Sequence, residues 1–163
     1  MPIDARTLYD IARAALRPME LGRHGEAGQV ACALETENGD VFTGICIDLP
    51  CGLGFCAEQA AAAQMLKEGT TAIRRIVAVH VDGGAIPPCG RCREFLVQLD
   101  GANAETLVVL PATATPAADG GSGNEVMGDG AVGDGFAKDG PSGPALREVR
   151  LAALLPERWD EES

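Results

Sequence analysis

Two short motifs contain the residues of this chain that are best suited to chemistry. They are Cys56-Ala57-Glu58 and Pro88-Cys89-Gly90-Arg91-Cys92. Thiolates from Cys56, Cys89 and Cys92 can hold a zinc ion, and three protein ligands leave its fourth tetrahedral position open for water. Glu58 is a carboxylate two residues after Cys56, and it can carry a proton to and from such a water. The pattern therefore predicts metal-assisted hydrolysis.

The elements that must position these residues follow from the spacing of apolar side chains. We expect an amphipathic helix over 4–19, a loop over 20–28, and strands over 29–35 and 41–47 that flank the hairpin signal Asn38-Gly39. Helices are expected over 56–68 and 89–99, and strands over 73–81, 106–110 and 146–151. This order predicts an α/β fold with a mixed sheet of about five strands, a hairpin at one side and helices covering it.

Each motif falls at the expected start of a helix. Cys56 opens the helix over 56–68, and Cys89 and Cys92 share the first turn of the helix over 89–99. The N–H groups of a first helical turn carry partial positive charge, which favours a thiolate over a thiol. Both predicted helices are therefore expected to support metal binding at their N-termini.

Together the two motifs resemble those of the cytidine deaminase superfamily, and most closely those of small cytidine deaminases and blasticidin-S deaminases. The resemblance covers about residues 5–110. It implies a three-layer α/β/α fold, one Zn²⁺ per chain and a homo-oligomer, either a tetramer or a dimer. It implies that Glu58 is the catalytic acid and base and that the Ala57 N–H lies near the pyrimidine O2. The implied reaction is hydrolytic deamination of a free, cytidine-like aminopyrimidine nucleoside, with release of ammonia.

The residues that would recognise a nucleoside depart from the family pattern. Ordinary cytidine deaminases carry Asn-x-Glu on the second strand, where this chain has Gly44-Ile45-Cys46-Ile47-Asp48. Asp48 is a candidate substrate contact in place of the missing acid. The family also places a phenylalanine near the base, and counting back from Val30 puts Gly28 at that position. A modified, damaged or antibiotic nucleoside or base is therefore the alternative substrate class, for example a blasticidin-S-like compound, an aminopurine or a triazine.

The charge around the metal also departs from the pattern. Small cytidine deaminases commonly have arginine after Cys-Ala-Glu, whereas this chain has Gln59. Three thiolates and Zn²⁺ sum to −1, so a compensating cation should be close. Arg91 and Arg93 are the candidates, and blasticidin-S deaminases share both the Cys-Gly-Arg-Cys-Arg run and the lack of an arginine after Cys-Ala-Glu. The alternative is that both arginines face solvent or acidic neighbours.

Other readings of the cysteines and histidines remain open. Cys51 could complete a closed, structural zinc site. Cys89 and Cys92 could instead form a redox Cys-x-x-Cys motif, or the chain could be a catalytically silent zinc-binding interaction module. Neither of these two alternatives would need an acid at Glu58. Cys32 and Cys46 are expected to be buried. His24 is expected on the surface, with substrate contact as the alternative, and His80 in the core or at a sheet edge.

Bulk properties limit the class of protein. The chain has 163 residues, 46% of them hydrophobic, so a single domain over 1–163 is expected. It contains no apolar run of 18 residues and no signal-peptide pattern, so we expect a cytoplasmic protein with no membrane partner. The 24 acidic and 13 basic residues give a net charge of −11, which disfavours a long nucleic acid as partner.

One segment differs in composition from the rest. Residues 116–144 are rich in glycine and aspartate, which predicts a flexible insertion that acts as a lid or a spacer. Beyond the last expected strand, Trp159 is a candidate aromatic near a neighbouring subunit's pocket, because family members tend to place one there.

Overall fold

The structure, a computed structural model, describes residues 2–112 and 143–156. The predicted insertion over 116–144 lies almost wholly outside this part, as does Trp159. The helices are α1 (Ala5–Ala15), α2 (Ala57–Lys67) and α3 (Gly90–Leu99), and within the described ranges none is long and apolar enough to cross a membrane. The strands are β1 (Met19–Leu21), β2 (Gly25–Thr36), β3 (Val41–Asp48), β4 (Ile73–His80), β5 (Ala85–Ile86), β6 (Leu107–Pro111) and β7 (Leu146–Arg150). Short 3₁₀ turns are η1 (Pro50–Gly52), η2 (Gly101–Glu105) and η3 (Leu151–Leu154).

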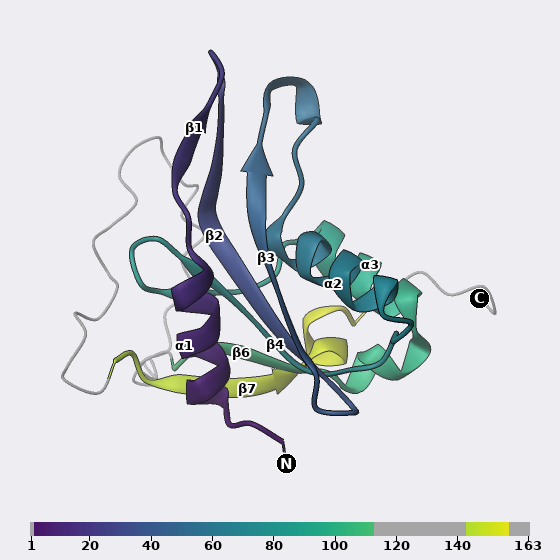
Figure 1. Cartoon of the computed structure of the whole chain (residues 1–163). Coiled ribbons are helices and arrows are strands. Elements are labelled where there is room, and N and C mark those ends of the chain that lie inside the picture. The colour runs from purple at the N-terminus through teal and green to yellow at the C-terminus, as the bar shows by residue number, and fades with distance from the viewer. Residues whose placement is uncertain (1, 113–142, 157–163) are drawn as a thin grey trace, which may run out of the picture.

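All seven strands belong to one mixed sheet (Figure 1). The five longer strands run in the order β3-β2-β4-β6-β7, and the short strands β1 and β5 pair antiparallel with β2 and β4. β4 and β6 are parallel, while β2–β3, β2–β4 and β6–β7 are antiparallel. The predicted mixed sheet is therefore confirmed, with two short strands that the sequence did not predict.

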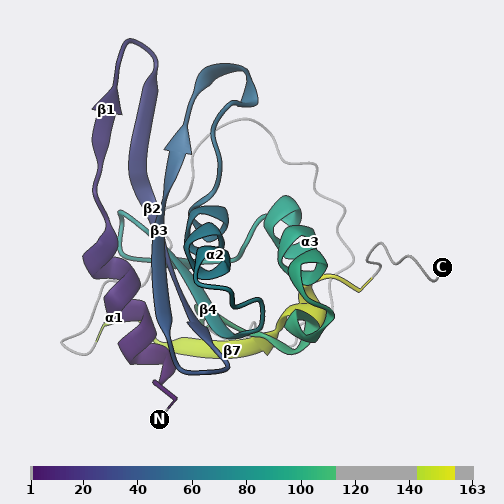
Figure 2. The ribbon, with the colours of Figure 1, turned by 45° about the vertical axis from the view of Figure 1, so that its right-hand side comes forward.

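Helices cover both faces of this sheet, which confirms the three-layer α/β/α fold (Figure 2). Alternate residues of the central strands face opposite layers, as the strand period of two requires. Ala33, Val77 and Val109 pack with Leu8 and Tyr9 of α1. Their neighbours pack with α2 and α3 in a second core cluster that includes Leu34, Ile76, Val108, Met65 and Leu96.

The N-terminal part of the prediction needs correction. The expected helix over 4–19 ends at Ala15, and residues 20–28, expected as a loop, form most of the β1–β2 hairpin. Pro18 supplies the physical reason, because it biases Arg17 toward extended backbone and away from the helical region. The Arg17 N–H then donates to the Gly28 carbonyl at 3.3 Å, which joins the chain to β2. The hairpin at Asn38-Gly39 forms as predicted.

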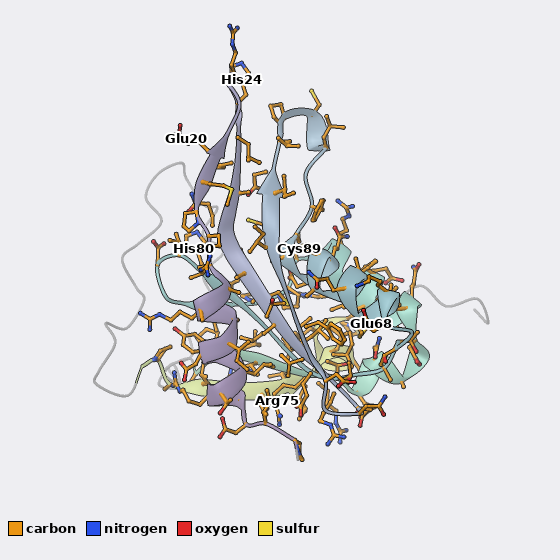
Figure 3. The ribbon with its side chains drawn as sticks, viewed as in Figure 1. Glu20, His24, Glu68, Arg75, His80 and Cys89 are labelled. Carbon is orange, nitrogen blue, oxygen red and sulfur yellow. The ribbon has the colours of Figure 1, made fainter. Side chains whose placement is uncertain are left out.

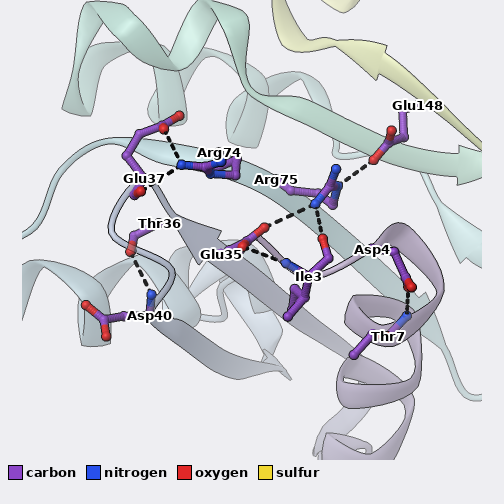
Figure 4. Close-up of polar contacts among 10 residues, drawn as sticks. All are labelled: Ile3, Asp4, Thr7, Glu35, Thr36, Glu37, Asp40, Arg74, Arg75 and Glu148. Carbon is purple, nitrogen blue, oxygen red and sulfur yellow. Dashed lines mark hydrogen bonds and ion pairs between the residues drawn. The ribbon is translucent and has the colours of Figure 1, made fainter. Parts of the chain in front are cut away.

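A buried carboxylate ties the N-terminal segment to the sheet (Figure 4). The Glu35 side chain on β2 is fully buried and accepts from the Ile3 N–H at 2.9 Å. Arg75 on β4 lies 3.1 Å from the same carboxylate, and it also donates to the Ile3 carbonyl and to Glu148 on β7. This network joins three strands and the start of the chain. Figure 3 places Arg75 at the end of the molecule opposite the β1–β2 hairpin tip.

We predict that Glu35→Ala lowers the free energy of unfolding by about 3 kcal/mol, because it removes the buried carboxylate that pairs with Arg75 and leaves the Ile3 N–H without its acceptor. Glu148→Ala is the matched control: it removes the second carboxylate of the same arginine, but from a side chain that is 32% exposed, so the cost should stay below about 1 kcal/mol. Urea unfolding of both variants measures the difference. Equal losses would contradict the role given to the buried pair.

Candidate metal centre

The three predicted ligand residues meet at the beginnings of two helices. Cys56 is the N-cap of α2, Cys89 is the N-cap of α3, and Cys92 lies on the first turn of α3. Their three Sγ atoms lie within 4.8 Å of one another, and the Sγ atoms of Cys56 and Cys89 are 3.7 Å apart. Three soft sulfur donors at this separation fit a zinc ion. Within the described residues this is the one cluster of potential metal ligands, and Cys51 is not part of it.

Close packing between α2 and β3 holds the start of α2 in place. A Cβ on Gly44 would lie 2.3 Å from the Ala61 N atom and 2.7 Å from the Ala57 carbonyl oxygen. Only a glycine on the strand and small residues on the helix allow this approach. The run Ala60-Ala61-Ala62-Ala63 supplies the small residues. The position of Cys56 and Glu58 is therefore set by backbone-to-backbone contact with the sheet.

Glu58 lies beside this sulfur cluster and is only 5% exposed. Burial raises the pKa of its carboxyl group, although hydrogen bonds from its own backbone N–H and from the Cys92 thiol oppose the shift. A buried carboxyl group with a raised pKa can hold a proton nearer neutral pH than an exposed one. The structure thus brings together all four residues predicted from the two motifs.

The three thiols differ in their electrostatics without a metal. Burial raises the pKa of Cys92, and the neighbouring Glu58 charge raises it further. Burial also raises the pKa of Cys56. For Cys89, burial is outweighed by hydrogen bonds from the backbone N–H and thiol of Cys92 and from the Cys56 thiol, so its pKa is lowered.

The predicted compensating cations lie in different surroundings. Arg91 is exposed and, together with Gln59, lines a groove between α2 and α3. Arg93 is half-buried, and its guanidinium donates to the carbonyl oxygens of Pro88 and Leu154. The two arginines are therefore not equivalent.

The α2–α3 groove contains residues that the sequence did not single out. It has a volume of about 740 Å³, and Phe55, Leu66 and Phe95 lie along it with Ala60 and Ala63. Phe55 and Leu66 are 39% and 38% exposed. The signal in the sequence is the apolar character of α2 on a second face, since Ala60, Ala63 and Leu66 recur every three residues.

The polar candidates of the hairpin region line a cavity whose lining contains none of the three clustered cysteines. Asp48 ends β3, is exposed and accepts from the Cys46 thiol at 3.3 Å. With Glu20 and His24 it lines a separate cavity of about 530 Å³. Figure 3 shows His24 at the tip of the β1–β2 hairpin, well away from Cys89.

The predicted burial of Cys32 and Cys46 is confirmed, whereas His80 is partly exposed at the end of the interior strand β4. Cys32 and Cys46 are buried, and none of the six cysteines forms a disulfide. Cys51 is exposed in η1. His80 ends β4, and its Nδ1 lies 2.9 Å from a carboxylate oxygen of Asp82.

Gly28 has no room for a side chain. Its φ is +73°, and a Cβ there would lie 2.0 Å from the Arg17 carbonyl oxygen. The aromatic residue that the family resemblance implied at this position is therefore incompatible with the backbone of this chain.

The sequence of the chain is similar to those of known proteins. Residues 6–109 match the family model for the cytidine and deoxycytidylate deaminase zinc-binding region. Over 72 residues the chain is 36% identical to a probable cytidine deaminase of Dictyostelium discoideum, which covers 43% of this chain and 49% of that protein. A cytidine deaminase of Halalkalibacterium halodurans is 35% identical over 72 residues, or 44% of this chain and 54% of that protein. The chain thus spans about half the length of the curated relatives it matches.

The fold is also shared with solved structures. Cytidine deaminase from Mycobacterium tuberculosis has a TM-score of 0.61 at 24% identity, with 97% of this chain and 98% of that chain covered. The enzyme from Burkholderia pseudomallei has a TM-score of 0.63 at 23% identity, with 96% and 100% covered.

The fold and the site define a three-layer α/β/α protein with a three-cysteine cluster that could hold a metal. Because the family model matches well over half of its residues, the chain belongs to the cytidine and deoxycytidylate deaminase family.

We predict that Gly28→Ala destabilises the fold by about 3 kcal/mol or more, because left-handed backbone strain adds to the clash with Arg17. Gly39→Ala is the control: its φ is +89° but a Cβ there meets nothing within 4 Å, so it should cost about 1 kcal/mol. Thermal and urea unfolding report both values. A Gly28→Ala variant as stable as Gly39→Ala would show that the backbone can accept a side chain at residue 28.

Proposed function

We propose that this chain is a zinc-dependent hydrolytic deaminase of a free, cytidine-like aminopyrimidine nucleoside. The observation that carries the proposal is the position of the buried Glu58 carboxyl group beside three converging thiols. Cys56, Cys89 and Cys92 would hold one zinc ion per chain. The ion supplies a Lewis acid that makes water nucleophilic near neutral pH.

Glu58 is the proposed acid and base. As a carboxylate it takes a proton from the attacking water, and as a carboxylic acid it gives the proton to the ring nitrogen of the substrate. In the second half of the reaction Glu58 takes the remaining proton from the hydroxyl group that has added to the ring carbon, and it delivers this proton to the amine, so that the carbon–nitrogen bond breaks and ammonia leaves. Burial suits this exchange, because a raised pKa reduces the cost of holding the proton between steps.

Main-chain and charged groups around Glu58 complete the proposed site. Ala57 is the first residue of α2, and the first N–H groups of a helix have no acceptor within the helix. We assign its N–H to the pyrimidine O2. The partial positive charge of two helix N-termini, together with Arg91 and Arg93, offsets the charge of the three thiolates. These groups take the role of the arginine that commonly follows Cys-Ala-Glu in small cytidine deaminases, where this chain has Gln59.

The alternative substrate is a modified, damaged or antibiotic nucleoside or base. The geometry at Gly28 favours it, because no aromatic residue at that position can contact the base. Asp48 remains a proposed sugar contact. An ammonia-release screen over cytidine, deoxycytidine, cytosine, blasticidin S and amino-substituted purines and triazines would identify the substrate class.

We also propose a homo-oligomer, either a dimer or a tetramer, in the cytoplasm. The apolar α2–α3 groove supports self-association, since exposed apolar patches of this kind mark interaction sites. Six cysteines without a disulfide support a reducing compartment. The net charge of −11 supports a small-molecule partner rather than a long nucleic acid.

We predict that Glu58→Gln lowers turnover of the best substrate by about 10²–10⁴-fold and leaves the zinc content unchanged, because the amide cannot accept the proton. Glu68→Gln is the matched control, since Glu68 is exposed at the far end of the same helix and should retain the full rate (Figure 3). Ammonia release measures both rates. Full turnover by Glu58→Gln would reject the mechanism, and zinc binding without deamination of any substrate would favour a silent interaction module.

We predict that the protein purified without chelator carries one zinc ion per chain. Serine at Cys56, Cys89 or Cys92 should remove most of it, because three thiolates form the whole protein ligand set. Cys51→Ser is the matched control and should retain the metal. Elemental analysis of the four variants decides between the open and the closed site, and loss of zinc from Cys51→Ser would indicate a fourth sulfur ligand.

A further inference from the structure

The Arg93 side chain joins the segment at Pro88 and Cys89 to the C-terminal part of the described chain. Its Nε donates to the Pro88 carbonyl oxygen at 2.8 Å, and its Nη1 donates to the Leu154 carbonyl oxygen at 2.9 Å. Pro88 is buried and directly precedes Cys89, while Arg93 directly follows Cys92. One guanidinium therefore connects the segment before Cys89, the helix that carries Cys92, and the turn η3.

The turn η3 is a firm anchor for this contact. Leu151 is fully buried, and its N–H donates to the Thr106 carbonyl at 2.9 Å. The Thr106 hydroxyl in turn donates to the Ile73 carbonyl of β4 at 2.7 Å, and Leu154 packs against the core cluster under α2 and α3. The Leu154 carbonyl is thus held relative to the sheet.

The loop at Cys89 lacks a side-chain support of its own. Cys89 is the N-cap of α3, but no side chain caps this helix, and Cys89 is exposed. The Arg93 backbone N–H donates to the Cys89 carbonyl at 3.0 Å, and its side chain holds the peptide carbonyl just before Cys89. Both carbonyl groups next to the Cys89 Cα atom are therefore bound by the same residue.

We propose that Arg93 is a positioning residue for Cys89 and Cys92, and that it acts by bridging the Pro88 and Leu154 carbonyls rather than through its charge alone. The inference rests on the proposed zinc site and not on the identity of the substrate. Two carbonyls on separate segments need the planar fork of a guanidinium, whose several N–H groups point in fixed directions. A lysine keeps the charge but cannot reproduce this geometry.

The test measures zinc release to a chelator from the full-length holoprotein. We expect Arg93→Lys and Arg93→Gln both to release zinc about 10-fold faster than the unaltered protein, which is the usual cost of losing a residue that orients a metal ligand. The cobalt-substituted Arg93→Lys variant should show a shifted thiolate-to-cobalt absorption band. Arg17→Lys is the matched control: the Arg17 guanidinium also donates to two carbonyl oxygens, those of Ala14 and Leu16, but at the end of α1 on the opposite face of the sheet, so its zinc release and cobalt spectrum should be unchanged.

A second variant addresses the other end of the bridge. Leu155→Pro removes the N–H that donates to the Ala152 carbonyl and closes η3, so it displaces the Leu154 carbonyl without changing Arg93. It should speed zinc release, and its combination with Arg93→Lys should add little, because both changes break one bridge. If Arg93→Lys does not fold, Leu155→Pro carries the test.

Wild-type zinc release by Arg93→Lys, together with fast release by Arg93→Gln, would overturn the proposal in favour of a purely charge-based role. Wild-type release by Leu155→Pro would overturn it as well. Failure of the unaltered protein to bind zinc would reject the proposed function itself, so the two failures are distinguishable.

Discussion

Two helices begin so close together that a thiol at the N-cap of one lies 3.7 Å from a thiol at the N-cap of the other. This convergence depends on the contact of α2 with β3, where Gly44 has no side chain and so allows the backbones of the strand and the helix to approach closely. It also buries Glu58 against the sulfur cluster, which raises the pKa of the carboxyl group. The geometry of the proposed chemistry is thus a consequence of how tightly α2 lies on the sheet.

The features that the sequence predicted well are those with a local physical signal. The cluster of three thiols follows from the spacing of three cysteines at helix starts, and the β2–β3 hairpin follows from Asn38-Gly39. The β1–β2 hairpin was missed because it pairs only three residues on each strand, Met19–Leu21 with residues 25–27, which is too short for a clear alternation of apolar and polar side chains. The contacts of Arg93 could not be predicted either, because Leu154 lies 61 residues further along the chain and no local pattern links them.

The reaction and the substrate depend on different parts of the molecule. The four residues of the candidate centre belong to the layer of α2 and α3, and they agree with membership of the deaminase family. The residues expected to read a nucleoside lie on β2 and β3, where Gly28 cannot carry an aromatic ring and β3 has no Asn-x-Glu. Under the proposed function, this contrast combines the chemistry of a deaminase with an altered recognition of the substrate.

The central claim is an open zinc site formed by three thiolates, with Glu58 beside it. X-ray absorption spectroscopy at the zinc edge of the purified protein tests this claim most directly, because it reports the number and type of ligand atoms. The account predicts three sulfur ligands and one oxygen or nitrogen ligand. Four sulfur ligands would contradict it, since a closed site has no place for the water on which Glu58 acts.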